Sequence, residues 1–362
     1  MKIGIISHLK HPIRQPFKGG LEAFTFQITQ ALQNLGHEVL LFASDSSDPQ
    51  LPLFPIISDE HYDTNSGLRR KHKDLPSEYI AEHHAYFKLM TQIDDYNLDV
   101  IFNNSLHYIP ITMANTISTP MLTALHTPPF YELNLAITRE RSFPVIKYVT
   151  VSNQSANNWS ELIKDCPVIL NGIDIESWKF YAAPSSPAYA IWFGRIHPDK
   201  GLHLAILAAR NAGLPLRVAG GIADRKYYQT RILPLLGKDI QLLGLLEHEE
   251  LNKQIGEASV CLVTPCWEEP FGLVVAEAMA CGTPVAGFQA GALPELLTKD
   301  TGVLVKKGDI IALSCAISQA QKLDRRKVRA HAVCKFSNSQ MTEKYEQMLG
   351  VTSGRKTFKY AL

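Results

Sequence analysis

The stretch that decides the fold is residues 2–43, KIGIISHLKHPIRQPFKGGLEAFTFQITQALQNLGHEVLLFA. Residues 3–6 (IGII) form a short apolar run, which is typical of a strand buried on both faces of a parallel sheet. A helix is predicted next, because apolar residues recur at helical spacing and Gly36 follows where a left-handed C-cap would end it. These apolar residues are Leu21, Phe24, Ile28, Ala31 and Leu35. Residues 39–43 predict a second strand, so the chain opens with a strand–helix–strand unit.

The alternation of strands and helices continues along the chain. A helix is predicted at 77–97, and further strands at 99–103, 121–125 and 145–151. After Asn171 and Gly172 the pattern starts again, with strands at 189–194, 215–219, 240–243, 259–264, 283–288 and 302–305, and helices from 201, at 226–236 and at 248–257. Two such series predict an α/β protein with two Rossmann-like, doubly wound domains, residues 1–172 and 173–338. A single βα barrel is the alternative.

Composition excludes several classes of protein. With 36 Lys and Arg against 35 Asp and Glu, the net charge of +1 gives no basic excess for binding nucleic acid. The six cysteines lack the paired C-x2-C spacing of a zinc site. The first apolar run is too short for a signal peptide, and no later one approaches the roughly 18 residues of a membrane span. We expect a cytoplasmic protein whose membrane contact is peripheral at most.

Ligands of open α/β sheets bind outside the carboxyl ends of the strands, so the loops after strands hold the candidate sites. Gly19 and Gly20 open the first predicted helix after such a loop. Glycine lets the backbone approach an anion, and a helix N-terminus supplies free N–H groups with a partial positive charge. Neither a G-x-G-x-x-G fingerprint nor a Walker loop is present, which disfavours standard dinucleotide and P-loop functions. A plain strand-to-helix turn is the simpler interpretation of this pair.

A second loop, FGRIHPDKG at residues 193–201, directly follows a predicted strand. Arg195 and Lys200 lie five residues apart in it. A planar guanidinium and a compact ammonium group are suited to clamping a diphosphate. An exposed basic pair can equally be a solvated surface.

The third stretch is CWEEPFGLVVAEAMACGTPV, residues 266–285, again after a strand. Pro270 suits the first turn of a helix, which would place Glu269 at the loop edge and Glu277 about two turns further on. That separation is too large for a close catalytic pair and suits two points on an extended ligand. Between them Phe271, Gly272 and Leu273 would present free helix N-terminal amides to a phosphate.

These motifs resemble those of the family-four retaining glycosyltransferases, nucleotide-sugar enzymes in which two Rossmann-like domains face each other across a cleft (GT-B). The resemblance covers nearly the whole chain. It is carried by the Arg-x4-Lys loop, E-x7-E at Glu269 and Glu277, Gly-Thr-Pro-Val from Gly282, Gly-Gly-x-Glu at 19–22, Asn-Gly-Ile-Asp at 171–174 and Ala-Gly-Ala-Leu-Pro-Glu at 290–295. In the last motif Ala292 stands where the family often has a second glycine, a departure that concerns the local loop geometry.

The resemblance implies a role for each candidate residue. Arg195 and Lys200 would hold the diphosphate, Glu277 the ribose hydroxyls and Glu269 the donor-sugar hydroxyls. His126, in LHTPPFYE at 125–132, would face the cleft near the donor sugar, although a lone histidine is more often structural. Leu245 lies in the turn 244–247, which corresponds to the base-binding turn of the family. Glu269, His126, Arg195 and Lys200 are therefore the candidate catalytic residues.

The sequence and the resemblance together predict transfer of a sugar from a nucleotide diphosphate sugar to a hydroxyl acceptor with retention of configuration. UDP is the first choice of nucleotide and GDP the second. No cofactor or metal is expected, because a cationic clamp and a helix N-terminus would take the charge that Mg²⁺ neutralises elsewhere. The acceptor, a saccharide, lipid or small molecule, should lie against the N-terminal domain. A nucleotide-sugar epimerase and a catalytically silent sugar-nucleotide binding protein are the alternatives.

Two further expectations concern the N-terminal domain. By resemblance, a helix from about Ser339 to Leu349, within residues 339–362, should cross back onto that domain, and Met341, Tyr345 and Met348 have helical spacing. The basic run at residues 69–73 (RRKHK) is most simply a solvated loop, with an anionic acceptor or a membrane surface as the alternative partner.

Overall fold

The computed structural model describes residues 1–58 and 77–354, and the chain forms two compact units. The N-terminal unit contains residues 1–151, 155–169 and 339–362, and the C-terminal unit contains residues 152–154 and 170–338. The basic run at 69–73 and residues 355–362 lie outside the described residues.

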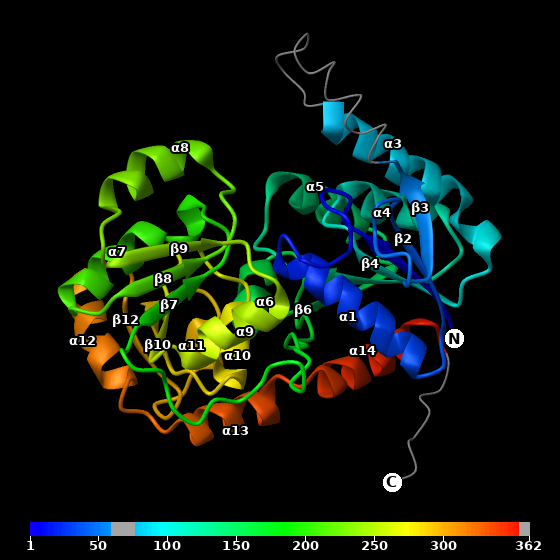
Figure 1. Cartoon of the computed structure of the whole chain (residues 1–362). Helices are drawn as coiled ribbons and strands as arrows, with labels where there is room; N and C mark the ends of the chain where they lie inside the picture. Colours follow the sequence, from blue (N-terminus) through cyan, green and yellow to red (C-terminus); the bar gives the residue numbers. More distant parts are fainter. Residues whose placement is uncertain (59–76, 355–362) are drawn as a thin grey trace. The chain divides into compact units, whose positions relative to one another are not determined.

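The N-terminal unit is built on a six-stranded parallel sheet (Figure 1) with the strand order β3-β2-β1-β4-β5-β6. Its strands are β1 (Lys2–Ser7), β2 (Glu38–Ser44), β3 (Leu53–Ile57), β4 (Val100–Asn104), β5 (Met121–Leu125) and β6 (Ile146–Thr150). This is the doubly wound order, and it reverses direction between β1 and β4. The crevice beyond the carboxyl ends of β1 and β4 is therefore where a ligand is expected.

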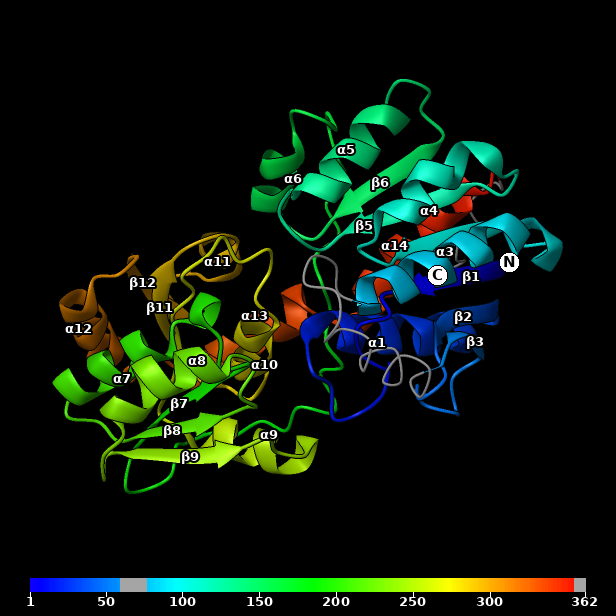
Figure 2. The same ribbon diagram turned by 90° about the horizontal axis from the view of Figure 1, so that it is seen from above.

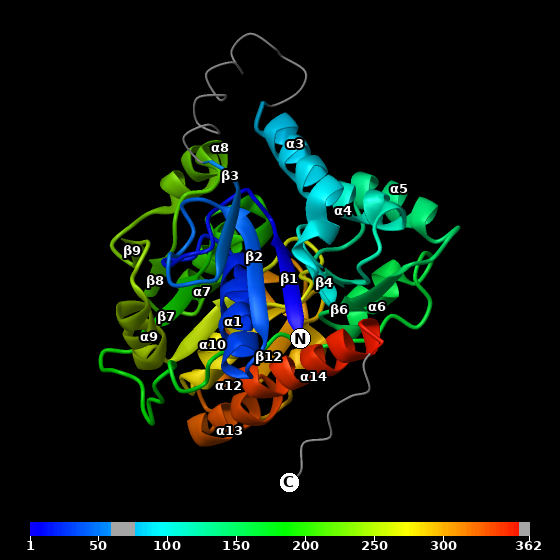
Figure 3. The same ribbon diagram turned by 90° about the vertical axis from the view of Figure 1, so that its right-hand side faces the viewer.

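Helices cover both faces of this sheet. They are α1 (Gly20–Asn34), α3 (Ser77–Gln92), α4 (Tyr108–Met113), α5 (Tyr131–Glu140), α6 (Asn153–Trp159) and α14 (Asn338–Thr352). One apolar core joins α1 and α14 to the sheet, and a second joins α3, α4 and α5 to its other face. Figure 3 shows α14, in red, alongside α1, and the Tyr345 ring lies 5.5 Å from the Phe24 ring of α1.

The C-terminal unit repeats this architecture (Figure 2). Its parallel strands run in the order β12-β11-β10-β7-β8-β9, which again reverses between its first and fourth strands, β7 and β10. They are β7 (Ala190–Phe193), β8 (Leu216–Ala219), β9 (Ile240–Gly244), β10 (Val260–Val263), β11 (Val285–Gln289) and β12 (Gly302–Lys306).

The helices of the C-terminal unit are α7 (Leu202–Asn211), α8 (Arg225–Tyr227), α9 (His248–Glu257), α10 (Leu273–Ala280), α11 (Leu293–Leu296), α12 (Ile310–Ala320) and α13 (Arg325–Lys335). Buried side chains of α7 and α12 share one core with β7, β8 and β10. Helix α10 contacts β10, β11 and α13. It is short, and five of its eight residues are buried, which anchors it against these strands.

The prediction of two Rossmann-like, doubly wound domains is confirmed, and the alternative of one barrel is wrong. Strand β3 is an element that the sequence pattern missed. It lies at the edge of its sheet, includes Pro55 and is only partly buried, so it lacks the apolar run of the central strands. Among the described residues, no helix has the length and apolar character to span a bilayer.

Tyr345 offers a test of how α14 is anchored. Its side chain is fully buried, yet its hydroxyl has no hydrogen-bond partner among the described residues. Tyr345→Ala should lower the free energy of unfolding by about 3–5 kcal/mol because a large buried ring is lost. Tyr345→Phe should leave it unchanged or raise it, since it removes only an unsatisfied polar group. Urea unfolding measures both, and an equal loss in the two variants would contradict this packing.

Candidate active site at the strand ends of the C-terminal unit

The candidate site lies where the strand order of the C-terminal sheet reverses. Strands β7 and β10 are parallel neighbours, and the loops that follow them, residues 194–201 and 264–272, leave the same edge of the sheet. These loops carry Arg195 and Lys200 on one side, and Glu269, Phe271 and Gly272 on the other. The topology thus explains why two motifs about seventy residues apart in the sequence meet.

Gly201 joins the two loops. Its φ of +64° lies in the left-handed region, and a Cβ atom at this position would overlap the carbonyl oxygen of Thr264. The hydroxyl of Thr264 donates to the carbonyls of Lys200 and Gly201, both at 3.1 Å, and the amide of Cys266 donates to the Asp199 carbonyl at 2.7 Å. A residue other than glycine would push the loops apart.

Lys200 and Glu269 form an ion pair at this junction. Lys200 Nζ lies 2.5 Å from Glu269 Oε2, and the indole Nε1 of Trp267 donates to the same oxygen at 3.0 Å. Lys200 Nζ also lies 5.4 Å from the centre of the Trp267 ring. The sequence indicated a clamp of Lys200 with Arg195, but the structure pairs Lys200 with Glu269. Sequence reasoning did not identify Trp267 as a site residue, although its position next to Glu268 and Glu269 indicated one.

Arg195 is the exposed cation of the site. No hydrogen bond or ion pair of its guanidinium is seen among the residues that the structure describes, and it follows Gly194 at the end of β7. Its five N–H groups are therefore available to an anion. A ligand phosphate can thus bind Arg195 without breaking an existing contact of that residue. Lys200, in contrast, would have to bind the phosphate while it remains paired with Glu269.

The start of α10 differs from the sequence prediction. The helix begins at Leu273, so Pro270 lies in the preceding loop and the prediction that it occupies the first turn is wrong. Gly272 is the N-cap, with φ +100°, and Phe271 is buried before it. The amide of Val275 donates to the Gly272 carbonyl at 2.9 Å, so the first-turn N–H groups without an acceptor among the described residues are those of Leu273 and Val274. The free N-terminal amides of the helix therefore begin at Leu273 rather than at Phe271.

Glu277 lies in the middle of α10 and is partly buried. Burial raises the pKa of its carboxyl group to about 7. No hydrogen bond or ion pair of this carboxylate is seen within the described part of the chain. The carboxylate of Glu277 can thus accept hydrogen bonds that the described residues do not supply. A hydrogen bond from a ligand hydroxyl would stabilise the charged form of this carboxylate and so lower its pKa.

The loop after β11 fixes the backbone of Glu269. Gly291 has φ +55°, and a Cβ atom there would overlap backbone atoms of Glu269. The amide of Ala292 donates to the Glu269 carbonyl at 2.9 Å. Ala292 itself has helical torsion angles, φ −75° and ψ −9°, so alanine fits where the family often has glycine. The departure from the family motif leaves the loop geometry intact.

Glycines stand at the ends of β7, β8 and β9. A Cβ atom on Gly220 would overlap the Gly194 carbonyl, and the Gly220 amide donates to the Gly244 carbonyl at 2.7 Å. Direct backbone contacts therefore join these strand ends. Leu245, predicted in the base-binding turn, follows Gly244 and is 56% exposed.

The remaining predicted residues belong to the N-terminal unit. Gly19 is the N-cap of α1 in an extended conformation, and the carboxylate of Glu22 lies beside it. His8 Nε2 lies 3.1 Å from Glu22 Oε1. Burial alone would raise the pKa of Glu22, but the hydrogen bond and charge of His8 turn the net shift downward. The carboxylate of Glu22 thus lies at the start of α1, where Gly19 and Gly20 were predicted to bind an anionic ligand.

His126 directly follows β5. Its Nε2 lies 3.2 Å from Asn104 Oδ1, and its ring centre lies 4.5 Å from that of Phe24. Burial, with a smaller contribution from His8, lowers the pKa of His126 to about 3. The imidazole is therefore neutral at physiological pH and suits hydrogen bonding to a hydroxyl better than proton transfer.

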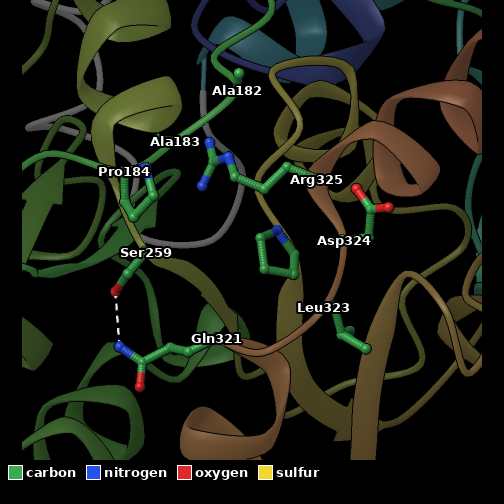
Figure 4. A pocket seen from close by; sticks show the side chains of 9 residues that line it. Ala182, Ala183, Pro184, Ser259, Gln321, Leu323, Asp324 and Arg325 are labelled. Atoms are coloured by element: carbon green, nitrogen blue, oxygen red, sulfur yellow. Dashed lines mark hydrogen bonds between the residues drawn. The ribbon is translucent and has the colours of Figure 1, made fainter.

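Figure 4 shows a cavity elsewhere in the C-terminal unit. It is lined by Ala182, Ala183, Pro184, Ser259, Pro284, Gln321, Leu323, Asp324 and Arg325, none of which is a candidate site residue. The Arg325 guanidinium donates to the carbonyls of Tyr181, Gly256 and Ala258 and to the Thr283 hydroxyl. Its donors are used in joining chain segments, so the role of Arg325 in this cavity is structural.

Comparison with known proteins gives matches to two families that together span most of the chain. The family described as Glycosyl transferases group 1 matches residues 174–333, and the one described as Glycosyltransferase Family 4 matches residues 18–177. A glycogen synthase of Mycobacterium tuberculosis is 33% identical over 165 residues, 43% of this chain and 39% of that enzyme. A phosphatidyl-myo-inositol mannosyltransferase of Mycolicibacterium smegmatis is 24% identical over 338 residues, 88% of this chain and 84% of that enzyme.

Solved structures share the fold. The Anabaena protein HepE in complex with UDP-glucose gives a TM-score of 0.73 at 19% identity, over 97% of this chain and all of that one (100%). A glycosyltransferase of avilamycin A biosynthesis gives 0.71 at 20% identity, over 99% of both chains. The chain spans only 39% of the glycogen synthase, so that enzyme's activity does not transfer by itself. The two family matches together span residues 18–333, and the chain belongs to the group 1 glycosyltransferases.

The raised pKa of Glu277 predicts how stability depends on pH. The folded protein holds this proton more tightly than the unfolded chain, whose glutamate pKa is about 4.3. Glu277 therefore costs stability increasingly as the pH rises from about 4.3 through 7. Glu277→Gln should raise the urea midpoint of unfolding at pH 8.5 and change it little at pH 5, whereas Glu176→Gln, an exposed control, should change neither. An equal shift of the urea midpoint at pH 5 and pH 8.5 in Glu277→Gln would refute this account.

Proposed function

We propose that the chain is a retaining glycosyltransferase, which transfers a sugar from a nucleotide diphosphate sugar to a hydroxyl of an acceptor. The observation that carries the proposal is the Lys200–Glu269 pair beside the first turn of α10. It places a cation for a diphosphate and a carboxylate for sugar hydroxyls next to free helix amides, at the strand ends where ligands of this fold bind. Membership of the group 1 glycosyltransferases supports it.

In this proposal the donor lies along the loops after β7, β9 and β10. Arg195, Lys200 and the amides of the first turn of α10 bind the diphosphate, and Glu277 accepts hydrogen bonds from the ribose. A Cβ atom at Gly244 would meet nothing within 4 Å, which leaves space for the nucleoside beside this turn, with its base at Leu245. UDP is the first choice of nucleotide and GDP the second. The structure of HepE, a protein of similar fold in complex with UDP-glucose, supports this order.

The reaction requires charge to be stabilised on the departing diphosphate. Arg195 has no competing contact among the described residues, and Lys200 can contact a phosphate while it keeps one of its three N–H groups on Glu269. These cations and the helix dipole oppose the developing negative charge without a metal ion. We therefore propose that the enzyme needs no divalent metal or other cofactor.

Retention of configuration is proposed to proceed on the front face of the sugar. The bond between the anomeric carbon and the diphosphate oxygen breaks, and the acceptor oxygen forms its new bond on the same face. The acceptor proton moves to the departing diphosphate oxygen. Glu269 is held by Lys200 and Trp267, which directs its carboxylate to hydrogen bonding rather than to nucleophilic attack. His126, a neutral imidazole of the N-terminal unit, is proposed to hydrogen-bond a donor-sugar hydroxyl.

Loss of either cation should slow the chemical step. Arg195→Ala and Lys200→Ala should each lower kcat by about 10²- to 10³-fold, as the removal of one charge-stabilising donor typically does. Glu277→Ala should act mainly on the donor KM, because a ribose contact is made equally in ground and transition states. Steady-state kinetics with Lys238→Ala, an exposed lysine of the same unit, provides the control. An unchanged kcat in Arg195→Ala would remove that residue from the mechanism.

Nucleotide binding tests the proposal directly. Calorimetric titration with UDP and with GDP in EDTA should give a Kd that added Mg²⁺ does not change. A strict requirement for Mg²⁺ would refute metal independence, and binding of neither nucleotide would refute the assigned donor.

The anomeric configuration of the product, measured by NMR, distinguishes the mechanisms. Incubation with donor alone separates transferase from epimerase, because an epimerase would convert the donor sugar without any acceptor. An inverted product or a covalent adduct on Glu269 would overturn the front-face route.

A further inference from the structure

A cluster of four aromatic and imidazole rings lies at the carboxyl edge of the N-terminal sheet. It consists of Tyr79 and His83 from the first turns of α3, His107 at the N-cap of α4 and Tyr108 at its first residue. The His107 ring stacks on Tyr108 at 4.8 Å between centres and lies 5.9 Å from Tyr79 and 6.2 Å from His83. We call these four residues the aromatic cluster.

The cluster stands at the place where this sheet is expected to bind a ligand. Strand β4 follows the reversal of strand order, and His107 lies three positions after its last residue, Asn104. The nucleotide residues proposed above all lie in the C-terminal unit, so they do not occupy this edge. The aromatic cluster is thus a second ring-lined position at the strand ends, on a different sheet.

His107 has an unused hydrogen-bond donor. Only 6% of the residue is exposed, and its Nδ1 accepts the amide of Ile109 at 3.2 Å. Burial and then the charge of His83 lower the pKa of His107 to about 4, so the ring is neutral and its hydrogen lies on Nε2. This N–H has no acceptor among the residues that the structure describes. Such a buried donor costs stability unless a ligand pairs with it.

One hydroxyl of the cluster is paired within it. Tyr108 Oη lies 2.6 Å from His83 Nδ1. Tyr79, His83 and Tyr108 are each partly exposed, so the outer edge of the cluster reaches solvent. The cluster therefore offers flat ring faces together with several groups that donate or accept hydrogen bonds.

The charges acting on Tyr79 are negative. Burial, Tyr108 and the carboxylates of Glu132 and Glu82 raise its pKa to about 12. Carboxylates accept hydrogen bonds from hydroxyls and repel phosphate. The cations Lys10 and Lys18 act instead on His11, in the loop after β1. A phosphate-bearing ligand would thus be directed to that loop, and a neutral one to the aromatic cluster.

We propose that the aromatic cluster binds the acceptor and that the acceptor is a neutral saccharide, an inference that rests on the proposed transferase function. Ring faces pack on the apolar face of a pyranose, His107 Nε2 donates to one hydroxyl of the saccharide, and Glu132 accepts from another. The class of acceptor is thereby narrowed to a saccharide without phosphate.

The test uses the full chain and saturation-transfer NMR, with and without UDP. The probes are neutral methyl glycosides and disaccharides, compared with glucose 6-phosphate, inositol 1-phosphate and phosphatidylinositol vesicles. Transfer to each probe is assayed with UDP-glucose, UDP-galactose, UDP-N-acetylglucosamine and GDP-mannose. Neutral saccharides should bind and accept the sugar in preference to the phosphorylated probes. Preference for a phosphorylated probe or a vesicle, or no binding of any neutral saccharide, overturns the proposal.

Variants separate binding from packing. Tyr79→Phe removes one hydroxyl and should raise the acceptor Kd and KM about three- to tenfold while the donor KM and the melting temperature stay the same. Tyr96→Phe, a partly buried tyrosine at the other edge of the same sheet, should change none of these values. Glu132→Gln should reduce the preference for neutral over phosphorylated saccharides. An unchanged acceptor Kd in Tyr79→Phe overturns the proposal.

The two proposals fail in distinguishable ways. If the chain binds neither UDP nor GDP, the proposed transferase function is refuted. The saccharide titration without nucleotide still decides whether the aromatic cluster binds a neutral saccharide. Intact UDP binding with no neutral saccharide bound refutes only the assignment of the acceptor.

Discussion

The close approach of Gly201 to the Thr264 carbonyl is the constraint on which the candidate active site depends. It holds the loop after β7 against the loop after β10, so that Lys200 reaches Glu269. Gly291 acts in the same way on the loop after β11, which holds the backbone of Glu269. Side chains could not replace these contacts, because each requires backbone to lie where a Cβ atom would be. Three loops from separate strands are thus held together by backbone contacts before any ligand binds.

The fold could be predicted well because its central strands are buried on both faces and read as apolar runs. Strand β3 could not, since an edge strand with Pro55 has no such run. The site was predictable in its residue types, since glycine, basic and acidic residues follow successive strands. Their pairing was not: Lys200 and Arg195 share one motif, yet Lys200 contacts Glu269, 69 positions away in the sequence. Which charges meet depends on loop conformation, and loop conformation depends on contacts between distant segments.

Buried groups were the hardest to predict. The sequence gives no sign that the described residues leave the His107 N–H and the Glu277 carboxylate without a partner, because both facts concern what is missing around a side chain. Buried polar side-chain atoms usually have a hydrogen-bond partner, and only the folded structure reveals where one is absent. The aromatic cluster, whose members come from α3 and α4, had no contiguous motif that could have indicated it.

Charged and polar groups at the candidate sites of both units differ from a buried structural cation in how they are paired. Arg325 is a buried cation, but carbonyls and a hydroxyl take up its donors, so it joins chain segments and nothing more. Arg195 and Glu277 carry charges, and His107 a donor, for which the described residues supply no partner. Each lowers the stability of the unliganded protein or contributes nothing to it, and each gains a partner if a diphosphate, a ribose or an acceptor hydroxyl binds there. At the strand ends, where ligands of doubly wound folds bind, the described residues thus leave Arg195 and the His107 Nε2 donor without partners.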